Sequence, residues 1–407
     1  MTDNIIAFSA TEVGYNHIKV NKICEDASDY YDDGKIHISV VADGHGSDNY
    51  PRTQYGSQFA VNAAIQCIVD FVNNAEASDV LSDNTHNYSM MYQLAKSILK
   101  VWYQQVEEDW EKRPFTEEEL ALVSDRYKSR YLSTDLQTRN IQKAYGCTLI
   151  AFVITTEYSF GMQIGDGKCV MVDENGQFSE PIPWDENCQL NVTTSICDND
   201  AIDEFRFFVA NTPPTAVFLG TDGIDDSYVN KEELYALYRS ILKIFIEHGN
   251  IIGKSEIKEY LPILTKRGSG DDVSLGLILN CELANANKDI WDAQSDIFQL
   301  NTKMKQEVYK KERIIEKKKA LTNKMKKMID SGKMSSEEYQ NTEIQFNDLV
   351  SAEMKIKESI TEIQKELQEK QNNIKNVYAK QNEPENTITE KIEIKEEEND
   401  LLGEEDA

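Results

Sequence analysis

The chain has 407 residues, a formal net charge of −28 and 40% hydrophobic residues, so it can form two or three domains with a sizeable core. The acidic excess argues against nucleic acid and anionic membranes as partners, because binding to both depends on positive charge. The seven cysteines show no Cys-x-x-Cys spacing, which argues against a zinc site or a disulfide framework.

We expect a cytoplasmic protein. An odd number of scattered cysteines fits a reducing compartment. The N-terminus, Met1–Ile6, lacks the basic flank and apolar run of a signal peptide. No stretch approaches the roughly 18 uninterrupted apolar residues that span a membrane.

The first 284 residues alternate between strand-like and helical segments. The strand-like segments are rich in Val, Ile, Phe and Thr, and the helical ones carry apolar residues at spacings of three and four. The predicted strands are Ile5–Ser9, Ile36–Ala42, Thr148–Thr155, Ser159–Ile164, Lys168–Asp173, Ala216–Thr221 and Val273–Leu279. The predicted helices are Gln58–Asn73, Met90–Glu111, Thr116–Tyr131, which Thr116 and Glu119 open as a capping box, and Lys231–Glu247. This order predicts an α+β sandwich of layers rather than a regular βαβ repeat.

A different composition begins near Asn285. An apolar series spaced by three and four runs from Ile297 to Met328, and a cleaner one runs from Phe346 to Val377. Between them lie a turn signal at Asp330–Lys333 and a capping box of Ser335 and Glu338. We therefore predict an antiparallel coiled-coil hairpin over residues 285–380.

The charges of the two arms support this hairpin. Lys303–Lys327 has 11 basic and 3 acidic residues, whereas Ser335–Glu369 has 3 basic and 9 acidic residues, so the arms attract each other. We interpret the basic arm as an exposed helix face rather than a nucleic-acid-binding surface. The continuous apolar stripe predicts a protein partner or self-association through the hairpin. The tail 381–407, with 11 acidic and 2 basic residues, is expected to be disordered.

Three aspartate turns adjoin apolar, strand-like runs. Asp43-Gly44-His45-Gly46 follows one run, Asp222-Gly223 follows a second, and Asp271-Asp272 precedes a third. One Asp-Gly turn would mean little, because this dipeptide is the commonest tight turn. Three in order, one of them with a histidine, indicate a cluster of carboxylates presented by a sheet.

Two further acidic segments join this set. Glu25-Asp26 precedes the first aspartate turn, and Asp166 lies in a turn between two predicted strands. The oxygen-rich set comprises Glu25, Asp43, Asp166, Asp222 and Asp271. Oxygen ligands without nitrogen favour Mg²⁺ or Mn²⁺, and two such cations about 3.5–4 Å apart can activate a water that attacks a phosphoryl group. His45 is then placed to protonate a leaving alkoxide.

These residues resemble the metal-dependent protein serine/threonine phosphatases of type 2C, the PPM class. Five blocks follow the family order over about the first 280 residues. They are Asp43–Gly46, Gly146–Leu149, Gly165–Gly167, Thr221–Asp226 and Gly268–Ser274. The resemblance implies a pair of antiparallel sheets flanked by helices. It also implies hydrolysis of phosphoserine and phosphothreonine in proteins by a water that bridges two Mg²⁺ or Mn²⁺ ions.

The resemblance also implies a role for each residue. Asp43 would bridge the two metals, Asp222 and Asp271 would complete one of them, and Glu25 with the Gly44 carbonyl would hold the other. The remaining implied roles are a weaker third metal at Asp166, orientation of water or ligands by Asp26 and Asp272, and general acid catalysis by His45. The motif register favours Asp271 as the ligand, since Asp272 stands where the family usually has Asn.

One departure concerns the phosphate. Many members carry an Arg four residues before the Glu-Asp pair, where this chain has Asn21. The preceding Gly14–His17 is similar to a bacterial-type branch, so His17 or Arg52 could take over the phosphate contact. The alternative interpretations are a hydrogen-bonded histidine at a strand end for His17 and a surface helix residue for Arg52.

Three functions remain to be compared. An active phosphatase accounts for every acidic block and for His45. A pseudophosphatase-like module, which binds phosphoproteins or recruits partners through its coiled coil, would explain the missing Arg and the appended hairpin. It should, however, have lost one of Asp43, Asp222 or Asp271, and all three are present. A cation-binding structural protein would not need His45. We therefore predict a phosphatase domain over residues 1–284, followed by the hairpin and the tail.

Overall fold

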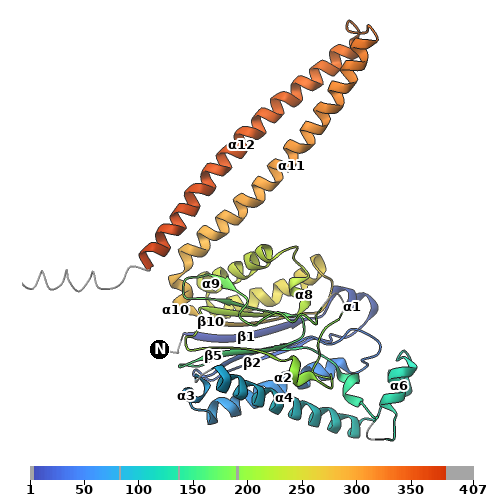
Figure 1. Ribbon diagram of the computed structural model, residues 1–407, viewed down its shortest axis with the longest axis vertical. Helices are drawn as coiled ribbons and strands as arrows, with labels where there is room; N and C mark the ends of the chain where they lie inside the picture. Colours follow the sequence, from blue (N-terminus) through green and yellow to red (C-terminus); the bar gives the residue numbers. More distant parts are fainter. Residues whose placement is uncertain (1–3, 82–83, 136–137, 189–191, 382–407) are drawn as a thin grey trace, which may run out of the picture. The chain divides into compact units, whose positions relative to one another are not determined.

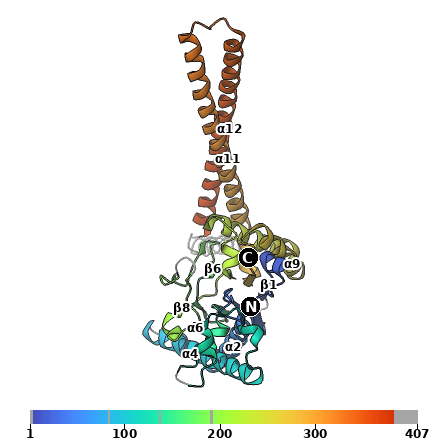
Figure 2. The ribbon, with the colours of Figure 1, turned by 90° about the vertical axis from the view of Figure 1, so that its right-hand side faces the viewer.

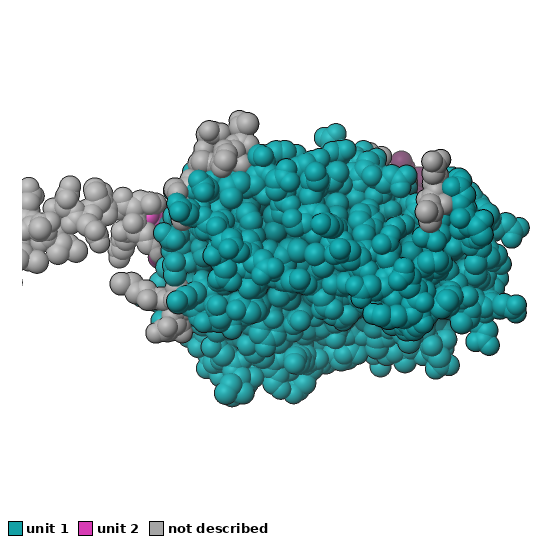
Figure 3. Space-filling view, turned by 90° about the horizontal axis from the view of Figure 1, so that it is seen from below, with its two compact units in different colours: residues 1–288 teal, residues 289–407 magenta. Residues whose placement is uncertain are grey.

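The structure is a computed structural model that describes residues 4–81, 84–135, 138–188 and 192–381. It divides into two compact units, residues 1–288 and 289–407 (Figure 3), and each is described by itself. The predicted tail lies outside the described residues from residue 382 onward. In the described part, every helix falls short of the length and apolar character required to cross a bilayer.

The first unit is built on two five-stranded antiparallel sheets (Figure 1), which confirms the predicted antiparallel sandwich. The first sheet, in spatial order, consists of β1 (Ile5–Glu12), β10 (Val273–Asn280), β9 (Ala216–Gly220), β6 (Lys168–Val172) and β7 (Phe178–Ser179). The second consists of β2 (Ala27–Asp32), β3 (His37–Ala42), β4 (Leu149–Ile154), β5 (Ser159–Ile164) and β8 (Arg206–Ala210). Buried apolar side chains from both sheets, among them Val41, Phe152 and Leu219, form the core between them.

Long helices cover the outer faces of the two sheets. Helices α2 (Thr53–Asn74) and α4 (Asn84–Lys112) lie on the second sheet, and α9 (Lys231–Arg267) lies on the first (Figure 1). Short helices fill the connections: α1 (Tyr15–Val20), α3 (Ala77–Val80), α5 (Glu117–Leu120), α6 (Asp125–Tyr131), the 3₁₀ helix η1 (Ile141–Tyr145), α7 (Ala201–Glu204), α8 (Asp222–Asp225) and α10 (Cys281–Ala286).

The predicted helix Thr116–Tyr131 is wrong as a single element. Its capping box exists, because Thr116 Oγ1 accepts from the Glu119 amide at 3.2 Å and Glu119 Oε2 accepts from the Thr116 amide at 2.8 Å. The helix nevertheless ends at Leu120, and a second one begins after Ser124. The Ser124 amide and hydroxyl both donate to Asn49 Oδ1, at 3.1 and 2.8 Å. A tertiary contact thus divides a segment that local propensity would join.

Other boundaries differ because the local signals are weak. Strand β2 was not predicted, since its sequence Ala-Ser-Asp-Tyr-Tyr-Asp lacks an apolar run. Helix α9 continues beyond the predicted Glu247 to Arg267 across a kink at Gly249, whose φ is +77°. A positive φ is accessible to Gly at little cost.

The second unit contains the predicted helical hairpin. Helices α11 (Lys288–Asp330) and α12 (Glu337–Gln381) lie side by side and antiparallel (Figures 1 and 2). Oppositely charged side chains join the arms: Lys318 Nζ lies 2.7 Å from Glu353 Oε2, and Lys324 Nζ lies 2.9 Å from Glu338 Oε1. The predicted cap at Ser335 is wrong by one residue, because Ser336 Oγ accepts from the Tyr339 amide at 3.2 Å.

Candidate metal centre

Three aspartates that lie far apart in the sequence meet at the ends of strands from both sheets. Asp43 directly follows β3, Asp166 lies in the turn between β5 and β6, and Asp222 begins α8 after β9. One carboxylate oxygen of each lies within 4.8 Å of the other two. The sandwich therefore gathers three of the five predicted ligands into one cluster.

The backbone around this cluster is fixed by Thr148 at the start of β4. The Asp43 amide donates to Thr148 Oγ1 at 3.1 Å, and the Thr148 amide donates to the Asp43 carbonyl at 2.8 Å. Gly165, which precedes Asp166, has φ +103°, and a Cβ there would lie 2.4 Å from Thr148 Cβ. Only Gly fits this turn, so the turn can bring Asp166 close to Asp43.

The carboxylates raise one another's pKa. Burial is the main cause of the raised pKa of Asp43, and the charges of Asp26, Asp222 and Asp166 add to it. Burial likewise raises the pKa of Asp222 to about 6, with contributions from Asp166 and Asp271. Buried like charges favour protonation unless a cation neutralises them. An all-oxygen donor set with this excess negative charge fits Mg²⁺ or Mn²⁺.

Glu25 and Gly44 lie next to each other, beside the three-aspartate cluster rather than within it. A Cβ on Gly44 would lie 2.4 Å from the Glu25 carbonyl oxygen, so the two backbones are in contact. The Glu25 carbonyl accepts from Ser57 Oγ at 2.6 Å, which ties it to α2. The Glu25 carboxylate is nearly buried and lies 2.7 Å from Lys22 Nζ. Burial raises the pKa of Glu25, and Lys22 partly offsets that effect.

Asp26, beside Glu25, is buried and accepts from Thr221 Oγ1 at 2.8 Å. Burial raises the pKa of Asp26, and Asp272 and Asp222 raise it further. The hydrogen bond therefore joins the Asp26 carboxylate to Thr221, the residue that precedes Asp222.

Asp271 and Asp272 have different surroundings. Asp272 is buried, and its two carboxylate oxygens accept from the amides of Gly14 and Glu25, both at 2.6 Å. The side chain of Asp271 is 59% exposed. Asp271 is thus accessible to a cation, although its Oδ1 accepts from the Asp272 amide at 2.9 Å, whereas the carboxylate of Asp272 joins three segments of backbone. Ligand atoms of His17, Asp271 and Asp272 lie within 4.8 Å of one another and form a second group that could hold a cation.

His45 lies in a tight space beside the cluster. Its ring packs edge-on against Tyr50, with ring centroids 4.8 Å apart. A Cβ on Gly146 would lie 2.6 Å from His45 Cδ2, so Gly is required at position 146. Burial lowers the pKa of His45 to about 4, and nearby Lys143 lowers it further while Asp198 opposes the shift.

His17 faces the last aspartate pair. Its Nδ1 lies 2.9 Å from Asp272 Oδ1, and its Nε2 lies 3.9 Å from Asp271 Oδ1. The residue belongs to the short helix α1, so the alternative interpretation as a strand-end histidine is wrong. His17 lies close enough to Asp271 to contact whatever Asp271 binds.

Arg52 is neither a surface residue nor free to contact phosphate. It is 2% exposed, and its Nε and Nη2 donate to the two carboxylate oxygens of Glu119 at 2.8 and 3.0 Å. Its Nη1 donates to Tyr145 Oη at 2.7 Å and lies 3.3 Å from Asp109 Oδ2. Both sequence-based interpretations missed that Arg52 stabilises the contact between α2, α4 and α5.

Two residues of the site were not predicted from the sequence. The first is Lys22, which follows Asn21, where a left-handed backbone with φ 56° ends α1. The sequence feature that could have indicated it is a basic residue three positions before Glu25. Asp225 lies one turn after Asp222, within a block that the sequence did match. Burial raises the pKa of Asp225 to about 7, whereas Lys168 lowers it.

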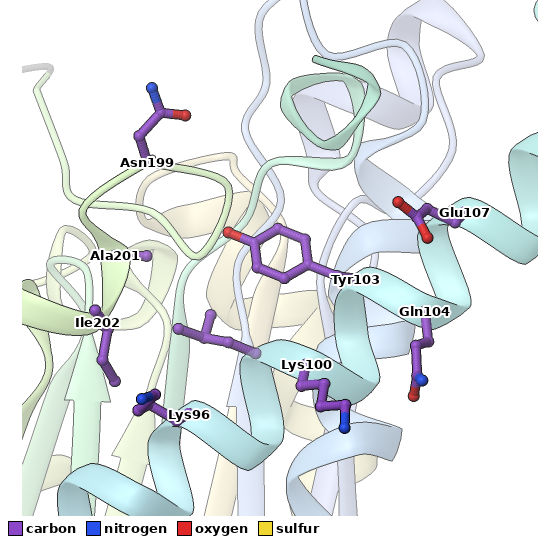
Figure 4. Close-up of a pocket in the computed structure, with 9 residues that line it drawn as sticks. Lys96, Lys100, Tyr103, Gln104, Glu107, Asn199, Ala201 and Ile202 are labelled. Carbon is purple, nitrogen blue, oxygen red and sulfur yellow. The ribbon is translucent and has the colours of Figure 1, made fainter. Parts of the chain in front are cut away.

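A cavity of about 390 Å³ lies away from the carboxylate cluster, between α4 and the start of α7. Tyr103 projects from α4 toward the segment that carries Asn199 and Ala201 (Figure 4). None of the clustered carboxylates lines it. The candidate site is therefore marked by converging charge rather than by cavity size.

Comparisons with known proteins identify the family of the chain. The model of the protein phosphatase 2C family matches residues 13–261, more than half of the chain. No curated protein sequence matches the chain significantly.

Among solved structures, PppA of Pseudomonas aeruginosa, described as a regulatory component of T6SS, is 14% identical, with 68% of this chain and 97% of that chain covered and a TM-score of 0.42. The serine/threonine phosphatase Stp1 of Staphylococcus aureus is 14% identical, with 67% and 94% covered and a TM-score of 0.41. The catalytic domain of PstP, solved with two manganese ions, is 13% identical, with 68% and 98% covered and a TM-score of 0.41. By the match to the family model, this chain belongs to the protein phosphatase 2C family.

Proposed function

We propose that the chain is a Mg²⁺- or Mn²⁺-dependent protein phosphatase that hydrolyses phosphoserine and phosphothreonine. The observation that carries this proposal is the convergence of Asp43, Asp166 and Asp222 within 4.8 Å. The chain belongs to a phosphatase family. The segments that carry Glu25 and Asp271 pack against the glycines that follow Asp43 and Asp222, since a Cβ on Gly44 would lie 2.4 Å from the Glu25 carbonyl oxygen and a Cβ on Gly223 would lie 2.0 Å from the Asp272 carbonyl oxygen. Every acidic block is retained, which supports the phosphatase over a pseudophosphatase, although the latter would explain Asn21 in place of the usual Arg and the appended hairpin.

The proposed ligand sets follow the resemblance and fit the donor chemistry. Asp43 would bridge two cations, Asp222 and Asp271 would hold one, and Glu25 with the Gly44 carbonyl would hold the other. Asp166 would form a weaker third site with Asp222. When bound, the cations supply an activated water and neutralise charge on the phosphoryl oxygens.

The other residues of the site would position ligands and move a proton. Asp272 accepts from the Glu25 amide, and Asp26 accepts from the Thr221 hydroxyl. Both carboxylates would therefore orient proposed ligands, Glu25 and Asp222, without binding a cation themselves. The resemblance assigns His45, two residues after Asp43, as the general acid for the leaving seryl or threonyl oxygen. Burial lowers the pKa of its imidazole to about 4 in the metal-free chain, so this proposed role requires the bound phosphoryl group to raise that pKa.

The phosphate contact falls to the N-terminal segment. His17 lies 3.9 Å from Asp271, and Lys22 places an ammonium 2.7 Å from Glu25. Each is next to a proposed metal ligand, so each could meet a phosphate dianion bound there. Arg52 is withdrawn from this role by its buried partners.

The test is hydrolysis of a phosphothreonine peptide by the purified full chain in the presence of Mn²⁺. We expect phosphate release that is abolished by Asp43→Asn, since the amide removes the bridging charge while retaining the side-chain shape. Equal release by the wild-type chain and by Asp43→Asn would contradict the proposal.

We further propose that the helical hairpin binds a protein partner or a second copy of the chain. Only part of its apolar stripe is buried: Ile363 and Leu367 are, whereas Phe346 and Ile356 are half-exposed. Helices that leave such a stripe exposed commonly pack against further helices.

A truncation should end after Lys288 rather than at residue 284, because Asn287 Nδ2 donates to the Glu174 carbonyl at 3.0 Å within the first unit. We expect light scattering and pull-downs to show a change in mass or in partners with activity on p-nitrophenyl phosphate retained. If the full and truncated chains show identical masses and identical partners, the hairpin acts only as a spacer.

A further inference from the structure

A small pocket of about 230 Å³ begins at Glu25, one of the proposed metal ligands. Four segments form it: the loop after α1, the segment 46–51 that follows His45, Gln54 at the start of α2, and α5 with the residues after it. The pocket is thus continuous with the proposed catalytic site. Its volume lies below the roughly 300–1,000 Å³ of sites for drug-sized ligands, so it suits a single side chain.

The pocket combines exposed apolar side chains with free carboxylates. Ile23 and Leu122 are 57% and 74% exposed, which is high for large aliphatic residues at the rim of a cavity. Asp48 and Glu118 also line the pocket and are exposed, and neither has an ion-pair partner within the described part of the chain.

The other charged groups of the pocket are already neutralised. The Glu119 carboxylate is held by the Arg52 guanidinium through two hydrogen bonds, at 2.8 and 3.0 Å. Lys22 pairs with Glu25 in the metal-free chain and donates to the Gly46 carbonyl at 2.9 Å, and in the proposed complex it faces the substrate phosphate. The charge that a ligand would meet is therefore negative, from Asp48 and Glu118.

We propose that this pocket receives an arginine or lysine side chain of the phosphoprotein substrate, from a position near the phosphorylated residue. Arginine and lysine place their methylene stems on apolar surface and their charged heads beside carboxylates. Ile23 and Leu122 offer apolar surface to the methylene stem, and Asp48 and Glu118 offer carboxylates to the charged head. The inference rests on the proposed phosphatase function and defines its substrate class.

The reach of an extended peptide is compatible with a phosphate at Glu25 and a flanking side chain in the pocket. An extended peptide advances about 3.3–3.6 Å per residue. A phosphate held beside Glu25 therefore places residues one to three positions away near the mouth of a pocket that starts at Glu25. A basic flanking residue enters this pocket, whereas an acidic one meets like charge.

The experiment compares three phosphothreonine peptides that carry Arg, Ala or Glu at the three positions on each side of the phosphothreonine. We expect kcat/KM of the full chain to fall in the order Arg, Ala, Glu, with at least about tenfold between Arg and Glu. The difference should shrink as the salt concentration rises, since exposed charges are screened. The double variant Asp48→Lys/Glu118→Lys should abolish or invert the order and leave hydrolysis of p-nitrophenyl phosphate unchanged.

Matched variants separate the pocket from general charge and from folding. Glu157→Lys/Glu259→Lys changes the net charge by the same amount at exposed positions outside the pocket and should keep the order. Leu122→Ser should lower kcat/KM for the Arg peptide, whereas Leu132→Ser, at a residue that is 57% exposed and outside the pocket, should not. The milder pair Asp48→Asn/Glu118→Gln repeats the test if the lysine variant fails to fold.

Equal kcat/KM for the Arg and Glu peptides, or a preference for Arg that survives in both pocket double variants, would overturn the inference alone. Absence of hydrolysis for all three peptides and for p-nitrophenyl phosphate would overturn the proposed function, and the inference with it.

Discussion

The carboxylate of Asp272 accepts a hydrogen bond from the backbone amide of Glu25 at 2.6 Å, across 247 residues of sequence. Its second oxygen binds the amide of Gly14 at the same distance. The last acidic block of the chain thus fixes the backbone of the first. Glu25 is positioned by a carboxylate whose two oxygens each accept a backbone amide.

The two adjacent aspartates should therefore respond differently to alanine. Asp272→Ala leaves two buried amides without acceptors, at a cost of about 1–3 kcal/mol each, so the free energy of unfolding should fall by about 2–6 kcal/mol. Asp271→Ala removes an exposed carboxylate, so stability in chelator should change by about 0.5 kcal/mol or less while Mn²⁺ binding weakens. Urea unfolding with excess chelator measures the first effect and calorimetry the second. Equal destabilisation by both variants would contradict the assigned roles.

The stability of the metal-free protein should depend on pH through Asp222. Its pKa is raised to about 6 in the folded protein, above the roughly 3.9 of an unfolded Asp, so the folded state binds more protons between these values. The contribution of Asp222 is fully present below about pH 4 and is lost as the pH rises through 6.

Urea unfolding in chelator should consequently show stability falling across that window, and Asp222→Asn should flatten the fall. Saturating Mn²⁺ should have the same flattening effect on the wild-type chain. A pH profile that is identical in the wild type and in Asp222→Asn would show that burial and the neighbouring carboxylates do not raise the pKa of Asp222 as described.

His45→Ala tests the general acid. The variant should bind Mn²⁺ normally and lose about 10²–10⁴ in kcat on a phosphothreonine peptide, whose alkoxide needs a proton to leave. The loss on p-nitrophenyl phosphate should be much smaller, because nitrophenolate leaves without protonation. Comparable losses on both substrates would remove His45 from this role.

Arg52→Gln tests the structural role of the buried guanidinium. Breaking a buried ion pair costs about 3–5 kcal/mol, and we expect the lower part of this range, because Glu119 loses its guanidinium partner whereas Asp109 keeps Arg113 and Tyr145. We expect that loss in urea unfolding, with an unchanged KM for p-nitrophenyl phosphate in the folded fraction. A raised KM at unchanged stability would instead indicate that Arg52 contacts the phosphate.

The sequence predicted the parts of the fold that depend on local pattern. The apolar run Leu149–Ile154, within the predicted Thr148–Thr155, became β4, because a strand buried on both faces favours a continuously apolar sequence. Polar β2 and the division between α5 and α6 were missed, since β2 lies at a sheet edge and Asn49 imposes the break from another part of the chain.

The site was likewise predicted only where its residues belong to recognisable sequence motifs. Motif order placed Asp43, Asp166 and Asp222 in one set, and the structure brings them together. The burial of Arg52 and the pairing of Lys22 with Glu25 were not predictable, because each depends on residues brought near by folding rather than by sequence. Spacing identifies candidate ligands, but only packing shows which charged groups remain free.

The central claim is that clustered carboxylates bind the cations that make this chain a phosphatase. The most direct measurement is a titration of Mn²⁺ into chelator-treated full chain, with bound metal and phosphate release from a phosphothreonine peptide followed on the same samples. The account predicts that release appears only as two ions bind per chain and that Asp222→Asn loses both at least one ion and the activity. Phosphate release in excess chelator, or full metal binding by Asp222→Asn, would contradict it.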